Sequence, residues 1–195
     1  MIKVVKPFVF LLGLVPFGYL VWGALTANLG ANLVEAITHF TGDWILRFLV
    51  ITLTISPLRY LTGWTWLTRF RRMMGLFAFF YSVLHFTIYC LSIAGLDVGE
   101  IVKDITMRRY VTVGFLSWVF MLLLAFTSTK GWIRRLGGKR WQMLHRLVYA
   151  SAILGVLHYL WLVKLDITHP LQYGAVIGVL LLFRVGVAIR TRLSP

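Results

Sequence analysis

Apolar residues run along this chain in six long stretches that are separated by short polar connections. Each stretch holds about 20 mostly apolar residues, the length an α-helix needs to cross a bilayer while satisfying its own backbone hydrogen bonds. The pattern therefore predicts an all-α fold, a polytopic membrane bundle that forms a single domain over residues 1–195. The six transmembrane helices are expected over residues 8–27, 44–61, 73–95, 110–127, 141–163 and 171–189.

The first stretch follows Lys3 and Lys6, as the apolar part of a secretory signal peptide would. It is long, however, and residues 26–30 contain no convincing small-residue cleavage site. We therefore interpret it as a membrane span that stays in the protein.

The composition supports a membrane protein and argues against other classes. The 195 residues are 59% hydrophobic and 13% charged, whereas an ordinary soluble domain is about 45–50% apolar and about 25% charged. The aromatic share of 15% argues against a disordered chain, because such chains are poor in apolar residues. The single cysteine, Cys90, leaves no internal disulfide and no cysteine cluster for zinc or an iron–sulfur centre.

Most basic residues lie on one predicted side of the membrane. Of the 20 lysines and arginines, 14 lie near the two termini or near the second and fourth connections, and all six acidic residues lie on the other side. Because lysine and arginine are enriched in cytoplasmic loops, both the N and C termini are predicted to be cytoplasmic. Topology thus explains the net charge of +14. Anionic membrane lipid is a secondary expected partner, and nucleic acid is not expected.

Three of the five histidines lie inside predicted spans: His85 in the third, and His145 and His158 in the fifth. An ionisable group inside a bilayer is costly, so it is a functional hypothesis by default. No acidic residue shares these two spans, which argues against a carboxylate proton relay and against a hard cation. Imidazole is a normal axial ligand of haem iron, and the pattern therefore favours a haem held between two helices.

His85 and His158 form the stronger expected ligand pair. Both of their spans run outward, so the two side chains can face each other at similar depth and bind one haem from opposite sides. His145 lies 13 residues before His158, a rise of about 20 Å and a turn of about 140° on an ideal helix. A second haem at His145, nearer the cytoplasm, therefore requires a bent or supercoiled helix.

The second site has no histidine opposite His145. Arg71 and Arg72 lie 14 and 13 residues before His85, and are candidates for contacts with haem propionates or for the ligand side of the second site. Both arginines are also explained as the positive flank of a span. Each membrane histidine has an alternative role as well, a hydrogen bond to a neighbouring helix.

Two further arginines and two further histidines complete the candidates. Arg47 and Arg184 lie inside predicted spans, where an isolated charge requires an anion such as a haem propionate or a lipid phosphate. His39 and His169 are predicted to lie in outward loops and not to bind haem.

Several short motifs, taken together, resemble one known family. They surround the three membrane histidines and extend into the first loop, the second span and the end of the fourth span. They read HFTG (39–42), TISPL (54–58), RRMMGL (71–76), LH (84–85), LAFTS (124–128), LG (136–137), LHRLVY (144–149) and LHYLW (157–161). Over nearly the whole chain the sequence is similar to the MsrQ (YedZ) family.

This resemblance implies a haem-binding membrane subunit of a protein-methionine-sulfoxide reductase system, with a core similar to the transmembrane part of ferric reductases and NADPH oxidases. It implies a b-type cytochrome of the bacterial inner membrane that passes electrons to MsrP, a periplasmic molybdopterin enzyme that repairs oxidised proteins. The implied donor is the quinone pool or a cytoplasmic flavin reductase. The implied cofactors are haem b (heme b), one or two per chain, and FMN. His85, His145 and His158 fall on the family's histidine positions.

Two departures leave alternatives open. The third span lacks the second histidine of ferric reductases, which leaves the number of haems open, and no glycine-rich phosphate loop is present, so an FMN site would be built from span ends and basic loops. An electron carrier of this kind need not itself perform substrate chemistry. The alternatives are a stand-alone ferric or quinone reductase on the same core, and a haem-free transporter or scaffold whose histidines join helices.

Overall fold

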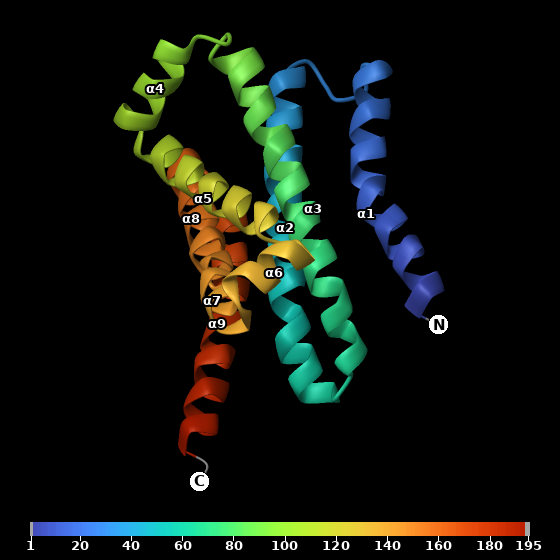
Figure 1. Cartoon of the computed structure of the whole chain (residues 1–195). Coiled ribbons are helices and arrows are strands. Elements are labelled where there is room, and N and C mark those ends of the chain that lie inside the picture. The colour runs from blue at the N-terminus through green and yellow to red at the C-terminus, as the bar shows by residue number, and fades with distance from the viewer. Residues whose placement is uncertain (1, 194–195) are drawn as a thin grey trace.

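The computed structural model describes residues 2–193, and in that range it contains helices and no strand (Figure 1). A 3-10 turn at Thr65–Leu67 precedes the third long helix, and a π-helical turn at Tyr89–Ile93 follows it. The α-helices are α1 (Ile2–Leu25), α2 (Leu33–Thr62), α3 (Thr68–Ile88), α4 (Val98–Met107), α5 (Arg109–Phe126), α6 (Lys130–Leu136), α7 (Gly138–Leu144), α8 (Leu147–Leu162) and α9 (Thr168–Leu193).

Six helical segments are long and apolar enough to cross a membrane. Each overlaps one of the six stretches expected from the sequence, so the prediction of an all-α bundle with six spans is confirmed. The segments are Val4–Leu25, Leu33–Thr62, Thr65–Ser92, Arg109–Phe126, Gly138–Leu162 and Thr168–Thr191.

Two helix pairs form the centre of the bundle. α2 packs along α3, and α5 packs along α8, while α9 joins the pairs by contacting both α8 and α2. In Figure 1 the start of α1 and the end of α9 lie at the same end of the bundle as the turn between α2 and α3, and α4 lies at the opposite end. Six spans return the chain to the side on which it started, so the two ends of the chain are expected at the same end of the bundle. The assignment of the α4 end to the outside remains a prediction.

The second helix is longer than its apolar stretch. α2 begins at Leu33, eleven residues before residue 44, because the Asn32 side chain accepts a hydrogen bond from the Glu35 N–H at 3.2 Å and caps the helix there. His39 therefore lies on α2, and His169 lies in the first turn of α9. The prediction of loops at both histidines was wrong, because hydropathy marks the membrane core and not the ends of a helix.

The fifth span is interrupted at its first histidine. α7 ends at Leu144 and α8 begins at Leu147, so His145 lies in the break between them. The indole N–H of Trp141 donates to the Thr127 carbonyl at 2.9 Å, and the rings of Trp141 and His145 stack with centroids 3.8 Å apart. The sequence analysis concluded that His145 and His158 could share a face only if the helix were bent between them. The structure contains a break at His145 itself.

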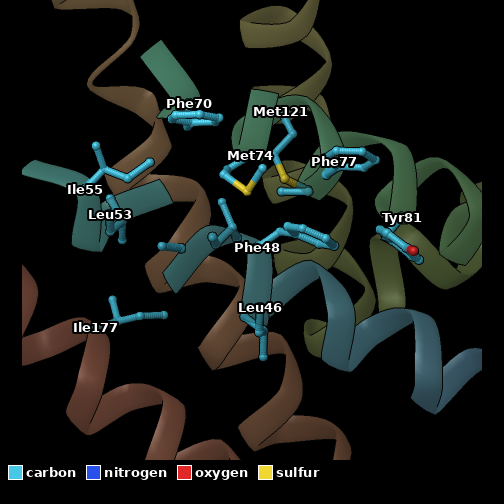
Figure 2. Packing of buried hydrophobic residues seen from close by; sticks show 13 residues of the cluster. Leu46, Phe48, Leu53, Ile55, Phe70, Met74, Phe77, Tyr81, Met121 and Ile177 are labelled. Carbon is cyan, nitrogen blue, oxygen red and sulfur yellow. The ribbon is translucent and has the colours of Figure 1, made fainter. Parts of the chain in front are cut away.

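Aromatic side chains fill the space between α2 and α3. Phe48 stacks on Phe77 and on Tyr81, with ring centroids 5.2 Å and 5.4 Å apart, and all three lie side by side in Figure 2. The Tyr81 hydroxyl donates to the Gly13 carbonyl at 3.0 Å, which fixes α1 against the pair. This packing makes α2 and α3 a firm support for the side chains they present to the rest of the bundle.

Candidate functional site

A cavity of about 220 Å³ lies between the α2–α3 pair and the α5–α8 pair. Its wall is mostly apolar and includes Leu46, Phe115 and Met121. His85 of α3 and His158 of α8 both line it, one from each helix pair. The structure thus brings together the two histidines that the sequence analysis paired.

The two imidazole rings are spaced as a shared metal would require. Their centroids lie 6.1 Å apart, and their planes are nearly perpendicular at 87°. A metal held by two imidazole nitrogens at about 2 Å each places the ring centres about 6 Å apart. Within residues 2–193 no group of three or more His, Cys, Asp and Glu side chains is arranged for a bare metal ion. The pair suits a metal whose remaining ligands come from elsewhere, as in haem.

Each ring is held at its Nδ1 atom by the neighbouring helix. His85 Nδ1 lies 3.1 Å from the Thr38 carbonyl oxygen, and His158 Nδ1 lies 2.7 Å from that of Tyr110. A carbonyl can only accept, so both Nδ1 atoms carry the proton and both Nε2 atoms keep a lone pair. Neither Nε2 has a hydrogen-bond partner in the described part of the chain. Carbonyl-held imidazoles with a free Nε2 are the usual state of a histidine metal ligand.

A glycine makes room for each imidazole. Gly42 lies four residues after Thr38, and Gly114 lies four residues after Tyr110, so each glycine stands one helical turn beyond the carbonyl that its histidine contacts. A Cβ atom on Gly114 would lie 2.5 Å from the Nδ1 atom of His158, and one on Gly42 would lie 3.4 Å from Cε1 of His85. The sequence analysis missed both glycines. Each glycine lies four residues after the residue whose carbonyl accepts from the histidine. This spacing could have pointed to the glycines only if the packing of the helix pairs had already been known.

A hydrogen-bond donor of the wall also lacks a partner within residues 2–193. Trp118 of α5 lines the cavity with its ring stacked on Phe86, centroids 4.6 Å apart. Its indole N–H is buried and makes no hydrogen bond within residues 2–193, which ordinarily costs about 1–3 kcal/mol. A ligand with an acceptor would satisfy this donor. Together with the imidazole spacing and the apolar wall, this unpaired donor fits a haem.

Known proteins are similar to this chain in sequence. Residues 41–156, more than half of the chain, match the family described as ferric reductase like transmembrane component. A protein of Herminiimonas arsenicoxydans named protein-methionine-sulfoxide reductase heme-binding subunit MsrQ is 52% identical over 186 residues, covering 94% of this chain and 85% of that protein. A protein of the same name from Ralstonia nicotianae is 50% identical over 186 residues, covering 94% and 86%. The chain belongs to the MsrQ family.

Membership of the MsrQ family confirms the resemblance noted in the sequence. The ferric reductase match includes both glycines and His85, and it ends two residues before His158. The shared core therefore comprises most of the two helix pairs around the cavity, while α1 and α9 lie outside it.

A polar network lies at the α4 end of the cavity. The buried Asp104 carboxylate accepts a hydrogen bond from the Tyr89 hydroxyl at 3.1 Å and forms an ion pair with Arg108, whose Nε atom lies 3.1 Å away. Arg108 also contacts the Tyr110 hydroxyl at 3.4 Å. Tyr110 and, to a smaller extent, the Asp104 carboxylate raise the pKa of Arg108. Arg108 lines the cavity, so it is the basic residue that the sequence analysis missed at this site.

The third expected ligand and the two arginines considered for the second site lie outside the cavity wall. His145, Arg71 and Arg72 do not belong to the cavity wall. The Thr127 hydroxyl donates to a carbonyl one turn earlier at 2.7 Å, so it accepts from Nε2 of His145 at 3.2 Å. His145 therefore carries its proton on Nε2, the opposite tautomer to the two cavity histidines.

Proposed function

We propose that this chain is a haem-binding electron carrier of the bacterial inner membrane that supplies a periplasmic methionine sulfoxide reductase of the MsrP type. The similar proteins are named heme-binding subunits of a protein-methionine-sulfoxide reductase. The observation that carries the proposal is the pair His85 and His158, held at Nδ1 by backbone carbonyls and free at Nε2, on opposite helix pairs of an apolar cavity.

A haem bound at this pair supplies one-electron chemistry through its iron. The chain's own residues set the conditions for that chemistry. The Thr38 and Tyr110 carbonyls orient the two imidazoles and make their Nε2 atoms more basic. The apolar wall keeps water out. The unpaired Trp118 N–H and the Arg108 guanidinium provide donors for the acidic groups of the ligand. Because the described part of the structure contains one such histidine pair, we expect one haem b per chain. A second haem could bind His145 through Nε2 only if the hydrogen bond between His145 and Thr127 broke.

The cavity lies toward the α4 end of the bundle, since Ile105 and Arg108 form part of its wall. In the predicted topology this is the periplasmic end, which suits delivery of electrons to a periplasmic partner. Acidic residues are concentrated at the same end, and we expect the partner enzyme to contact them. Electrons would enter from the opposite, basic end, from a quinone or a cytoplasmic flavin reductase, with FMN as a further proposed cofactor.

The partner's role can be tested by following reoxidation of the purified chain. The chemically reduced protein is mixed with methionine sulfoxide, with and without the MsrP-type enzyme, and its absorbance is recorded over time. We expect reoxidation only when the enzyme is present. Reoxidation by the sulfoxide alone would contradict the relay and favour an autonomous reductase.

A further inference from the structure

A proline in the second span leaves one backbone carbonyl without its usual partner. Pro57 has no N–H, so the Leu53 carbonyl one turn earlier on α2 receives no helical hydrogen bond. Arg184 of α9 fills this position, because its Nη2 atom donates to the Leu53 oxygen at 2.8 Å and to the Ser56 hydroxyl at 3.0 Å. Arg184 thereby joins α9 to α2 inside the membrane.

The remaining contacts of Arg184 are also neutral. Its Nη1 atom donates to the Tyr149 hydroxyl of α8 at 2.7 Å, and its guanidinium lies over the Tyr149 ring, 5.1 Å from the centroid. Its Nε atom is buried and has no hydrogen-bond partner among the described residues. The partners of Arg184 therefore accept hydrogen bonds from its two Nη atoms, but they are neutral and do not balance its positive charge.

The neighbouring charges are of the same sign. Arg71 of α3 lies within electrostatic range of Arg184, of Arg59 and of the Tyr149 hydroxyl. We refer to Arg59, Arg71 and Arg184 as the arginine cluster. The ion pairs of the described residues use the carboxylates of Glu35, Asp43, Glu100 and Asp104, all near the α4 end or the α1–α2 connection. None of them neutralises the cluster.

The other arginine inside a span shows the contrast. Arg47 has a carboxylate 3.6 Å away in Asp43, and its guanidinium lies over Trp44, 4.8 Å from the ring centroid. The sequence predicted that both intramembrane arginines require an anion. The chain itself supplies that anion for Arg47, whereas none of the ion pairs among residues 2–193 involves Arg184.

We propose that the arginine cluster is a binding site for a phosphate group. Guanidinium groups bind phosphate oxygens through paired charge-assisted hydrogen bonds. Arg71 and Arg184 both lie near the Tyr149 hydroxyl, and Arg59 lies near Arg71, so the cluster offers more than one positive charge to a single ligand, which favours a phosphate over a carboxylate. The phosphate has two sources at this end of the bundle, the headgroup of an anionic phospholipid or a soluble phosphate monoester such as FMN. Tyr149 lies nine residues before His158, about 14 Å along α8, so this site is separate from the cavity and stands whether or not a haem binds there.

Binding can be measured on the full-length chain in detergent with defined probes. FMN and riboflavin, which differ in the phosphate, are titrated against the protein by quenching of flavin fluorescence, and retained phosphatidylglycerol is counted by native mass spectrometry. Arg71→Gln removes one charge of the cluster at an exposed position and leaves the bonds of Arg184 in place. We expect it to weaken binding of the phosphate-bearing probe about tenfold, the effect of one lost charge-assisted hydrogen bond.

Arg72→Gln is the matched control, since it removes the same charge one residue along the same helix. We expect it to change the affinity by less than twofold. Binding of FMN but not riboflavin would assign the phosphate to a flavin, and retention of one phosphatidylglycerol without FMN binding would assign it to a lipid. Equal behaviour of the two variants, or no binding of either probe, would overturn the proposal. A loss of haem in Arg71→Gln with unchanged phosphate binding would overturn it as well, because the cluster would then serve a haem propionate.

Discussion

At the scale of single residues, the site depends on small groups beside the histidines as much as on the histidines. The sequence could predict His85 and His158, because an imidazole inside an apolar span is rare and conspicuous. It could not predict Gly42 and Gly114, whose value lies in a missing Cβ on the helix that packs against each imidazole. It offered Arg71 and Arg72 as candidates for contacts with haem propionates and did not consider Arg108, which the structure puts in the cavity wall.

Gly114→Ala should disrupt the cavity on the His158 side. The new Cβ would lie 2.5 Å from Nδ1 of His158, so the ring would have to leave the Tyr110 carbonyl and its ligating position. We expect at least a tenfold loss of haem affinity, measured by titrating haem into the purified protein. Gly42→Ala is the matched variant, because its Cβ meets His85 at 3.4 Å, an ordinary contact, and should lower the affinity much less. Equal losses in both variants would contradict the role assigned to Gly114.

Trp118 and Trp44 offer a second matched pair. Both have a buried indole N–H without a partner among the described residues, but only Trp118 lines the cavity. Trp118→Phe should weaken haem binding several-fold, since the ligand loses a hydrogen-bond donor, while Trp44→Phe should leave haem affinity unchanged. The same titration measures both. An unchanged affinity in Trp118→Phe would show that its donor does not face the ligand.

At the scale of helices, the sequence predicted the spans and missed what surrounds them. Hydropathy located all six spans, because about 20 apolar residues in a row have few other uses. It missed the first turns of α2 and the whole of α4, which depend on caps at Asn32 and Asp97 and not on apolar length. Hydropathy also missed the break between α7 and α8, because the apolar residues on either side outweigh the two polar residues of the break, His145 and Arg146.

The closure of the cavity by α4 should depend on Asp104. Asp104→Asn removes the ion pair with Arg108 and changes the acceptor of the Tyr89 hydroxyl, so α4 should open more often. We expect at least a tenfold rise in amide hydrogen exchange across α4, measured by mass spectrometry. Glu100→Gln removes the same charge from an exposed pair with Lys103, and exposed pairs contribute little, so exchange should stay near that of the unmodified protein. A rise of equal size in both variants would assign the effect to net charge.

At the scale of the whole molecule, two helix pairs each present one histidine to a shared cavity. The α2–α3 pair supplies His85 with its carbonyl and glycine on α2, and the α5–α8 pair supplies His158 with its carbonyl and glycine on α5. The sequence contains no evident repeat, because the two helix pairs hold their histidines in the same way but with different surrounding residues. The proposed function depends on this convergence, since neither pair alone could hold a metal from both sides.

The most direct test of this account is the absorption spectrum of the detergent-purified chain, oxidised and then reduced, with haem quantified per chain. The account predicts a sharp low-spin b-type spectrum that His85→Ala and His158→Ala each abolish at this site while helicity is kept, and that His169→Ala leaves intact. A colourless protein produced with ample haem, or full haem content in both cavity variants, would contradict it.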